Sequence, residues 1–298
     1  MKIAHVNNTA GIASILSRRQ RSLGNVVEVY VFNKYLHRQF GGTKINYRFP
    51  FSRWKFFEKL KDYEVWHYHY PYGSLRRALE KRVAGRTYLK HYHGDDLRGK
   101  CDNDFCLVST PDLLEYAPNG KWFPTPIDLE ELVYTPSYSN QFTPSRKPIV
   151  AHYPHYRLYQ KYEDLYSTAL HQLEKEGKCH IITIFDTPRN DTLRILSSCD
   201  IVVGKILPQI GWFGKFELEA MAIGKPVVAY ISSHLFQSFN PPIYRTTKDT
   251  LKGDLETLLS DIDEQRKLSK AGRLYVEKYH SVDNSVKFLD GVYRTSQQ

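Results

Sequence analysis

The sequence predicts an α/β protein made of two successive domains, each with a parallel β-sheet flanked by helices. Three observations lead to this class. The chain opens as strand, turn, helix and strand, a second strand–helix series starts near residue 148, and a stretch rich in Pro, Ser and Thr separates the two. A chain of 298 residues is long enough for two cores. We expect domains at 1–125 and 126–280 and a C-terminal helical tail at 281–298.

The first domain begins with a βαβ unit. Lys2–Val6 predicts a strand, Ile12–Leu23 a helix that ends at a Gly-Asn pair, and Val26–Phe32 a second strand. This unit is typical of a parallel sheet with helices on its faces. Further strands are expected at Glu64–Tyr68, Arg86–Tyr92 and Phe105–Ser109.

The second domain is expected to follow a linker that runs from Pro124 to Lys147. Its predicted strands are Pro148–His152, His180–Phe185, Asp200–Val203 and Pro226–Ile231. Its predicted helices are Tyr162–Gly177, Thr192–Ser198, a helix after Gly214, and the mostly helical stretch Asp254–Tyr279.

The composition excludes several classes of protein. With 41% hydrophobic and 25% charged residues, the chain reads as soluble and globular. No run of about eighteen apolar residues occurs, so no membrane-spanning helix is expected. The N-terminus enters a strand pattern directly and does not read as a signal peptide. The cysteines lack metal-ligand spacing, and we expect reduced thiols in a cytoplasmic protein.

The positive charge is concentrated in the first domain. Residues 1–125 hold 21 Lys and Arg against 11 Asp and Glu, whereas residues 126–298 hold 21 of each. A basic face of this kind indicates an anionic partner, which is either nucleic acid or an anionic membrane surface.

The most informative segment runs from Gly211 to Ala229. A glycine-bounded turn leads into a helix with two acids, and a glycine then precedes a buried strand. Such a turn presents free N–H groups and a positive dipole end, which suit a phosphate. From the residues alone two interpretations stay open: a nucleotide or phosphate site, or an ordinary α/β unit whose acids are solvated.

This segment resembles the C-terminal signature of GT-B glycosyltransferases of the GT4-like group (glycosyl transferase group 1), E-G-F-G-x-x-x-x-E-A-M-A-x-G-x-P-V. The matching positions are Phe213, Gly214, Glu219, Ala220, Met221, Ala222, Gly224, Pro226 and Val227. One departure is that Gly211 stands where the family has its first glutamate. Pro124–Asp128 also resembles the family's hinge, and Arg273–Ser281 its closing segment.

The resemblance implies a fold, a reaction and roles for residues. The fold is GT-B, with two Rossmann-like domains facing across a cleft and a last helix that returns to the N-terminal domain. The reaction is transfer of a sugar from a nucleotide-diphosphate sugar, with retention of configuration and without metal or other cofactor. The family's first glutamate is associated with the donor sugar and its second with the ribose, which assigns the ribose to Glu219.

The remaining donor-site candidates surround the predicted diphosphate. Gly211, Trp212, Phe213 and Gly214 would offer backbone groups, and the turn at Gly11 resembles one that approaches the phosphates. Arg157 and Lys161 loosely match the family's basic pair, although Tyr162 replaces the glycine that usually follows the lysine; a solvated surface explains the two bases equally well. Lys205 and Lys215 lie near the turn without a ranking, and Glu217 is expected outside the site.

A second motif lies in the first domain. His91–Gly99 resembles the family's H-G-x-D-x-R segment, which makes His93 the candidate that faces the donor sugar, with Asp95, Asp96 and Arg98 shaping the pocket or the acceptor side. From the residues alone, a histidine beside a carboxylate is also a common structural pair. His67 and His69 alternate on a strand, where lining of the core or cleft is favoured over zinc.

The segment Arg48–Lys61 mixes aromatic and basic residues. The candidates for a membrane interface are Arg53, Trp54, Lys55, Phe57 and Lys59. The alternative is a helix whose apolar face packs on the core while its basic face is solvated.

The sequence therefore predicts a glycosyltransferase whose acceptor is anionic or lipid-linked, in a cytoplasmic protein that is peripheral on the inner face of the cell membrane. The departure at Gly211 keeps a non-catalytic, nucleotide-binding partner subunit open as an alternative. A nucleic-acid-binding protein is a weaker alternative, because no nucleic-acid motif accompanies the basic half.

Overall fold

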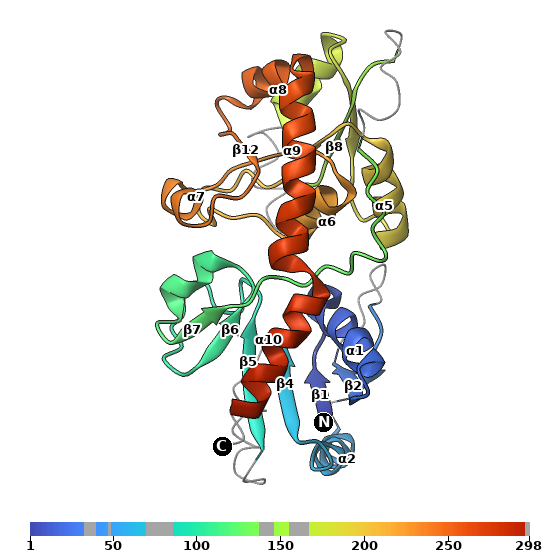
Figure 1. Ribbon diagram of the computed structural model, residues 1–298, viewed down its shortest axis with the longest axis vertical. Coiled ribbons are helices and arrows are strands. Elements are labelled where there is room, and N and C mark those ends of the chain that lie inside the picture. Colours follow the sequence, from blue (N-terminus) through green and yellow to red (C-terminus); the bar gives the residue numbers. More distant parts are fainter. Residues whose placement is uncertain (33–39, 47–48, 70–85, 137–145, 155–166, 296–298) are drawn as a thin grey trace. The chain divides into compact units, whose positions relative to one another are not determined.

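The computed structural model describes the chain except for residues 33–39, 47–48, 70–85, 137–145, 155–166 and 296–298 (Figure 1). The chain forms two compact units. Unit 1 consists of Met1–Asp128 and His280–Gln298, and unit 2 of Leu129–Tyr279. In the described part of the chain, every helix is too short or too polar to cross a membrane.

Unit 1 contains a seven-stranded sheet in which every neighbouring pair is parallel. Its strands are β1 (Lys2–Val6), β2 (Val26–Val31), β3 (Thr43–Lys44), β4 (Val65–His69), β5 (Thr87–Tyr92), β6 (Cys106–Val108) and β7 (Gly120–Trp122). Their order is β3-β2-β1-β4-β5-β6-β7. The order reverses direction between β1 and β4, and the carboxyl ends of strands at such a switch point are where open α/β sheets bind ligands.

The C-terminal helix belongs to unit 1. The helices of this unit are α1 (Ile12–Ser22), α2 (Pro50–Leu60), the short 3₁₀ helices η1 (Thr9–Gly11) and η2 (Pro111–Tyr116), and α10 (Val282–Thr295). Val286 and Leu289 of α10 pack in one core cluster with Leu16 of α1 and Leu89 of β5 (Figure 1). The predicted return of the last helix to the N-terminal domain is thus confirmed.

Unit 2 contains a five-stranded parallel sheet of order β12-β11-β10-β8-β9. Its strands are β8 (Ile149–His152), β9 (His180–Thr183), β10 (Ile201–Val203), β11 (Val227–Ala229) and β12 (Tyr244–Arg245). The chain order reverses between β8 and β10, so the ends of these two strands form the switch point of unit 2.

The helices of unit 2 cover this sheet. They are α5 (Arg189–Ser198), α6 (Lys215–Ile223), α7 (Ser233–Phe239), α8 (Leu251–Ser260), α9 (Ile262–Tyr275), the π-helical turn η4 (Val276–His280) and a described helix over 167–175. The stretch expected to be mostly helical, Asp254–Tyr279, contains two helices that meet at Asp261. The Asp261 carboxylate accepts a hydrogen bond from the Glu264 N–H and so caps the start of α9.

The predicted α/β class with two parallel sheets is confirmed. The sequence did not predict β3, β7, β12 or α7. Three of these are strands of only two or three residues, and so short a segment carries no readable alternation of polar and apolar positions.

Candidate active site

The turn before α6 is held in place by Glu217. This residue is 1% exposed, and its carboxylate accepts hydrogen bonds from the backbone N–H groups of Lys205 and Gly214, each at 2.8 Å. A Cβ atom on Gly204 would lie 2.5 Å from Glu217 Cγ, so the approach requires glycine there. Glu217 is therefore a structural residue beneath the turn. The Gly214 N–H, predicted to bind phosphate, is already used by it.

The two aromatic residues of the turn are anchors. Trp212 and Phe213 are each 2% exposed, their rings stack at 4.5 Å, and Trp212 lies 5.7 Å from the ring of Phe239 on α7. Gly211 has φ of 68°, and a Cβ atom there would lie 3.0 Å from Ser232 Cβ. A glutamate at position 211 would thus be strained, which accounts for glycine in this turn.

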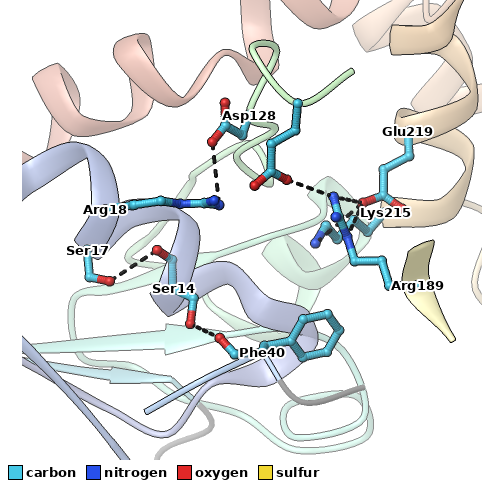
Figure 2. Close-up of polar contacts among 9 residues, drawn as sticks. Ser14, Ser17, Arg18, Phe40, Asp128, Arg189, Lys215 and Glu219 are labelled. Atoms are coloured by element: carbon cyan, nitrogen blue, oxygen red, sulfur yellow. Dashed lines mark hydrogen bonds and ion pairs between the residues drawn. The ribbon is translucent and has the colours of Figure 1, made fainter. Parts of the chain in front are cut away.

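Glu219 lies at the centre of a charged cluster. Its Oε1 accepts hydrogen bonds from Arg189 at 3.1 and 3.3 Å and lies 3.6 Å from Lys215 Nζ, and Arg189 also pairs with Glu131 at 3.2 Å (Figure 2). Glu219 itself is 6% exposed. The pKa of Lys215 is lowered, because the effect of burial exceeds the opposing effect of the Glu219 carboxylate. Arg189 could not be foreseen as part of the site, because it starts α5 and lies thirty positions before its partner Glu219.

Lys205 supplies a second cation beside the turn. A Cβ atom on Gly214 would lie 2.6 Å from Lys205 Nζ, so the ammonium group is directly next to this glycine. Lys205 follows β10 and therefore lies at the switch point of the unit 2 sheet. The basic pair predicted from the family, Arg157 and Lys161, lies outside the described residues.

In unit 1, both ring nitrogens of His93 have partners. Nε2 lies 3.1 Å from His69 Nδ1, and Nδ1 lies 2.7 Å from Ser109 Oγ. Burial lowers the pKa of His93 to about 3, so the ring is neutral at physiological pH. While these contacts hold, His93 presents the carbon face of its ring to a ligand, and no free ring nitrogen.

The acids and the arginine after His93 shape the turn that carries it. Asp96 is 7% exposed and accepts hydrogen bonds from the N–H groups of His93 at 2.9 Å and Gly94 at 2.7 Å. Arg98 pairs with Asp112 at 2.8 Å and with Asp95 at 3.3 Å. Asp96 and Arg98 thus have partners that hold the loop, and Asp95 is the more exposed acid.

The turn at Gly11 is closely packed. Gly11 has φ of 77°, and a Cβ atom there would lie 2.5 Å from the ring of Phe40. The Asn8 amide donates to Ser14 Oγ at 2.8 Å and to the Gly41 carbonyl at 3.2 Å, and Ser14 Oγ donates to the Phe40 carbonyl (Figure 2). The phenyl ring covers Gly11, so the glycine here serves packing between the turn and this ring.

The α2 segment divides the predicted membrane candidates. Phe57 is 7% exposed and packs in the core with Leu60, so its assignment to an interface was wrong. Trp54 and Phe51 are 53% and 63% exposed, and their rings stack at 6.1 Å with Lys55 Nζ 4.6 Å from the centre of the Phe51 ring. The exposed aromatic surface of α2 is therefore Phe51 and Trp54, next to Lys55.

Comparison with known proteins identifies the fold. No protein-family model and no curated protein sequence matches the chain. Solved structures do match over nearly its whole length. Sucrose-phosphate synthase from Thermosynechococcus elongatus aligns with a TM-score of 0.67 and 14% identity over 99% of this chain and 98% of its own. A glycosyltransferase from Rickettsia africae aligns with a TM-score of 0.68 and 13% identity over 100% and 98%.

A third similar structure contains a bound nucleotide sugar. Anabaena HepE in complex with UDP-glucose aligns with a TM-score of 0.67 and 14% identity, over 99% of this chain and 100% of its own. At such identities the likeness concerns the fold. Two parallel Rossmann-like sheets and a last helix that packs on the first unit complete the pattern. The protein has the GT-B fold of the glycosyltransferases.

Proposed function

We propose that the protein is a GT4-like glycosyltransferase that moves a sugar from a nucleotide-diphosphate sugar to an acceptor. The observation that carries this proposal is the cluster around Glu219, inside a GT-B fold. A buried carboxylate and two lysines, Lys205 and Lys215, gather at the turn that follows β10. This is the switch-point edge of a parallel sheet, where such folds bind nucleotides.

The cluster has the chemistry that a nucleoside diphosphate needs. Glu219 Oε1 accepts from Arg189 and lies 3.6 Å from Lys215 Nζ, and Oε2 would accept hydrogen bonds from ribose hydroxyls. Lys205 beside Gly214, together with the first turn of α6, offers positive charge to the diphosphate. The neighbour that binds UDP-glucose supports a nucleoside diphosphate as the ligand class.

The proposed reaction proceeds with retention and without a metal ion, as the family resemblance implies. Negative charge develops on the diphosphate as the bond to the sugar breaks. Lys205 and Lys215 would stabilise that charge, and the departing diphosphate would assist removal of the acceptor proton on the same face of the sugar. His93, neutral and fixed just beyond β5, would contact the donor sugar through the face of its ring.

The acceptor is proposed to be anionic or lipid-linked, and the protein to be cytoplasmic and peripheral on the inner face of the cell membrane. The support is the basic character of residues 1–125 and the exposed pair Phe51 and Trp54 beside Lys55. Aromatic rings near exposed lysines suit the interfacial zone of an anionic bilayer.

Calorimetric titration of wild type and Glu219→Ala with UDP, GDP and their sugar conjugates tests the donor site. We expect one diphosphate to bind, with a Kd raised about tenfold or more in Glu219→Ala, because a hydrogen bond to a charged group is worth about 1.5–3 kcal/mol. Asp263→Ala, a 93% exposed acid on α9, is the matched control and should bind like wild type. Failure of wild type to bind any of them would refute the proposed donor site.

The glycine at position 211 favours one second candidate, which is a nucleotide-binding partner subunit without catalytic activity. The family's glutamate for the donor sugar is absent there, and the φ of 68° disfavours its introduction. The same titrations decide between the two, when combined with a transfer assay on the nucleotide sugar that binds. Binding without hydrolysis or transfer would favour the subunit, and turnover would eliminate it.

A further inference from the structure

Five histidines of unit 1 lie together toward the carboxyl-terminal ends of strands β1, β4 and β5. His5 lies opposite His67 in the β1–β4 register, and His69 lies opposite His91 in the β4–β5 register, with His93 just beyond β5. The first four are fully buried, whereas His93 is partly exposed. Neighbouring rings are 4.1 to 5.3 Å apart between centres.

The hydrogen bonds of these histidines link them with three further side chains in one continuous circuit that starts at Gln20 and ends at Tyr293. In order, the contacts are Gln20 Oε1 to His5 Nε2 (2.8 Å), His5 Nδ1 to His69 Nε2 (2.9 Å), His69 Nδ1 to His93 Nε2 (3.1 Å), His93 Nδ1 to Ser109 Oγ (2.7 Å), Ser109 Oγ to His91 Nε2 (2.9 Å), His91 Nδ1 to His67 Nε2 (3.2 Å) and His67 Nδ1 to Tyr293 OH (2.7 Å). The Gln20 side chain also lies near the Tyr293 hydroxyl, and a hydrogen bond between these two groups would close the circuit.

With Oε1 of Gln20 facing His5, the direction of every bond in the circuit follows. Oε1 of an amide can only accept, so His5 must donate through Nε2–H and accept at Nδ1. A neutral imidazole has one donor and one acceptor, so the same assignment passes through His69 to His93. Ser109 then donates its single proton to His93 Nδ1.

The other half of the circuit follows in the same way. Because its proton is used, Ser109 must accept from His91 Nε2–H, and His91 Nδ1 accepts from His67 Nε2–H. His67 Nδ1 accepts from the Tyr293 hydroxyl. If the Gln20 NH₂ group donates to Tyr293, each of the eight groups donates once and accepts once within the circuit.

We infer that His5, His67, His69, His91 and His93 form one hydrogen-bonded ring with Gln20, Ser109 and Tyr293, in which all five imidazoles are neutral Nε2–H tautomers. Gln20 is the positioning residue that selects this tautomer for the whole ring. Turning its amide over would reverse every bond and move all five protons to Nδ1. The role of the ring in orienting His93 toward a donor sugar rests on the proposed function, whereas the ring itself does not.

Burial supports the neutral state. Desolvation lowers the pKa of His5 to about 4 and of His93 to about 3, and it holds the pKa of His67, His69 and His91 well below the usual value. An added proton would give an imidazolium two donors where the circuit offers one acceptor. The ring therefore exists only while every member is neutral.

A bound metal is the competing explanation of the same cluster. The groups His5, His67, His69 and His69, His91, His93 each have ligand atoms within 4.8 Å of one another. Nitrogens on one tetrahedral zinc ion lie about 3.3 Å apart, which is close to the observed spacings. The ring is favoured because each of these nitrogens already has a complementary donor or acceptor, including the hydroxyls of Ser109 and Tyr293.

Long-range ¹H–¹⁵N correlation spectra of protein labelled with ¹⁵N-histidine test the inference without a substrate, so the result is independent of the proposed function. At neutral pH the two nitrogens of each tautomer have distinct shifts. We expect five Nε2–H imidazoles, unchanged by EDTA and by one equivalent of Zn²⁺. A ring histidine in the Nδ1–H or doubly protonated form, or Zn²⁺ shifting the His69 and His93 signals, would overturn it.

Variants test the part played by Gln20. Gln20→Leu should produce a mixture of tautomers among the five histidines. Ser17→Ala is the control and should leave the signals of these histidines unchanged. Ser17 is also buried on α1, but its hydroxyl donates to the Ser14 carbonyl, outside the hydrogen-bonded ring. Tyr293→Phe breaks the circuit at its other end, because it removes the hydroxyl that donates to His67 Nδ1. His5 should remain the Nε2–H tautomer, whereas His67 should become a mixture of tautomers. A folded Gln20→Leu protein that keeps five Nε2–H signals would contradict the role of Gln20.

Discussion

Mild acid should destabilise unit 1 far more than unit 2. Six histidines of unit 1 have pKa values lowered by burial: His5, His67, His69, His91, His93 and His280. In the described part of unit 2, the same cause lowers the pKa of His152 to about 4. The folded state holds these imidazoles neutral, whereas the unfolded chain can protonate them. The free energy of unfolding is therefore highest above the unfolded pKa of about 6.5, and it falls as the pH drops toward the pKa values of the folded state.

The magnitude follows from protonation of the unfolded chain. Between about pH 7 and pH 5.5, a histidine that stays neutral when folded costs about 1.2 kcal/mol of stability, because the unfolded ring binds a proton. Six such rings sum to about 7 kcal/mol, which is comparable with the whole free energy of unfolding of a typical domain, about 5–15 kcal/mol. His152 alone accounts for about 1.2 kcal/mol in unit 2.

Hydrogen–deuterium exchange separates the two units in one experiment. Peptides from β1, β4 and β5 should lose protection between these pH values after correction for the intrinsic exchange rate, and peptides from β8 and β10 should keep most of theirs. His180→Gln is the control, because His180 lies at the surface with its side chain 61% exposed. The reasoning would be refuted if the free energy of unfolding of unit 1 fell by less than about 2 kcal/mol between these pH values, or if it fell equally in both units.

Three further predictions concern single residues. Glu217→Ala should lower the free energy of unfolding of unit 2 by about 2–4 kcal/mol, because the N–H groups of Lys205 and Gly214 lose their acceptor. The loss should exceed that of Glu219→Ala when both variants are unfolded in urea, and an equal loss would contradict this. Lys205→Met should raise the Kd for a diphosphate about tenfold in calorimetry but leave that for the nucleoside unchanged, and equal effects on both would place Lys205 away from the diphosphate. Trp54→Ala should reduce sedimentation with anionic vesicles, whereas neutral vesicles should bind neither protein; wild type that fails to bind anionic vesicles would argue against a membrane surface.

The sequence predicted the fold class better than the site. Strands such as β1 and β4 carry long apolar or alternating patterns, and the glycine turn before α6 marks its own start, so both sheets could be foreseen. Charge partners could not, because Arg189 meets Glu219 only after α5 and α6 are packed together. Helical spacing grouped Trp54 with Phe57, yet the helix faces the core through Phe57 and leaves Trp54 exposed.

The histidine ring shows the same limit from another side. His67 and His69 could be placed on one strand from the alternation of residues, but their partners come from other strands and from helices at both ends of the chain. The parallel register brings His5 beside His67, and α10 brings Tyr293 to the same ring. The pairing of β1 with β4 and the packing of α10 join segments far apart in the sequence, so no local pattern shows them.

Each of the two sequence motifs contains a pair of acids, and in each pair one acid supports the loop. Asp96 accepts from the N–H groups of His93 and Gly94, and Glu217 accepts from those of Lys205 and Gly214. Backbone N–H groups at the carboxyl end of a parallel strand have lost their ladder partners, and a buried carboxylate satisfies two at once.

The support explains why the other acid of each pair is the one to test for binding. Asp95 has a 51% exposed side chain, and Glu219 accepts from Arg189 through Oε1. Loss of Asp96 or Glu217 would leave two backbone N–H groups without their acceptor and loosen the turn that carries them. We therefore expect loss of Asp95 or Glu219 to change affinity before it changes stability.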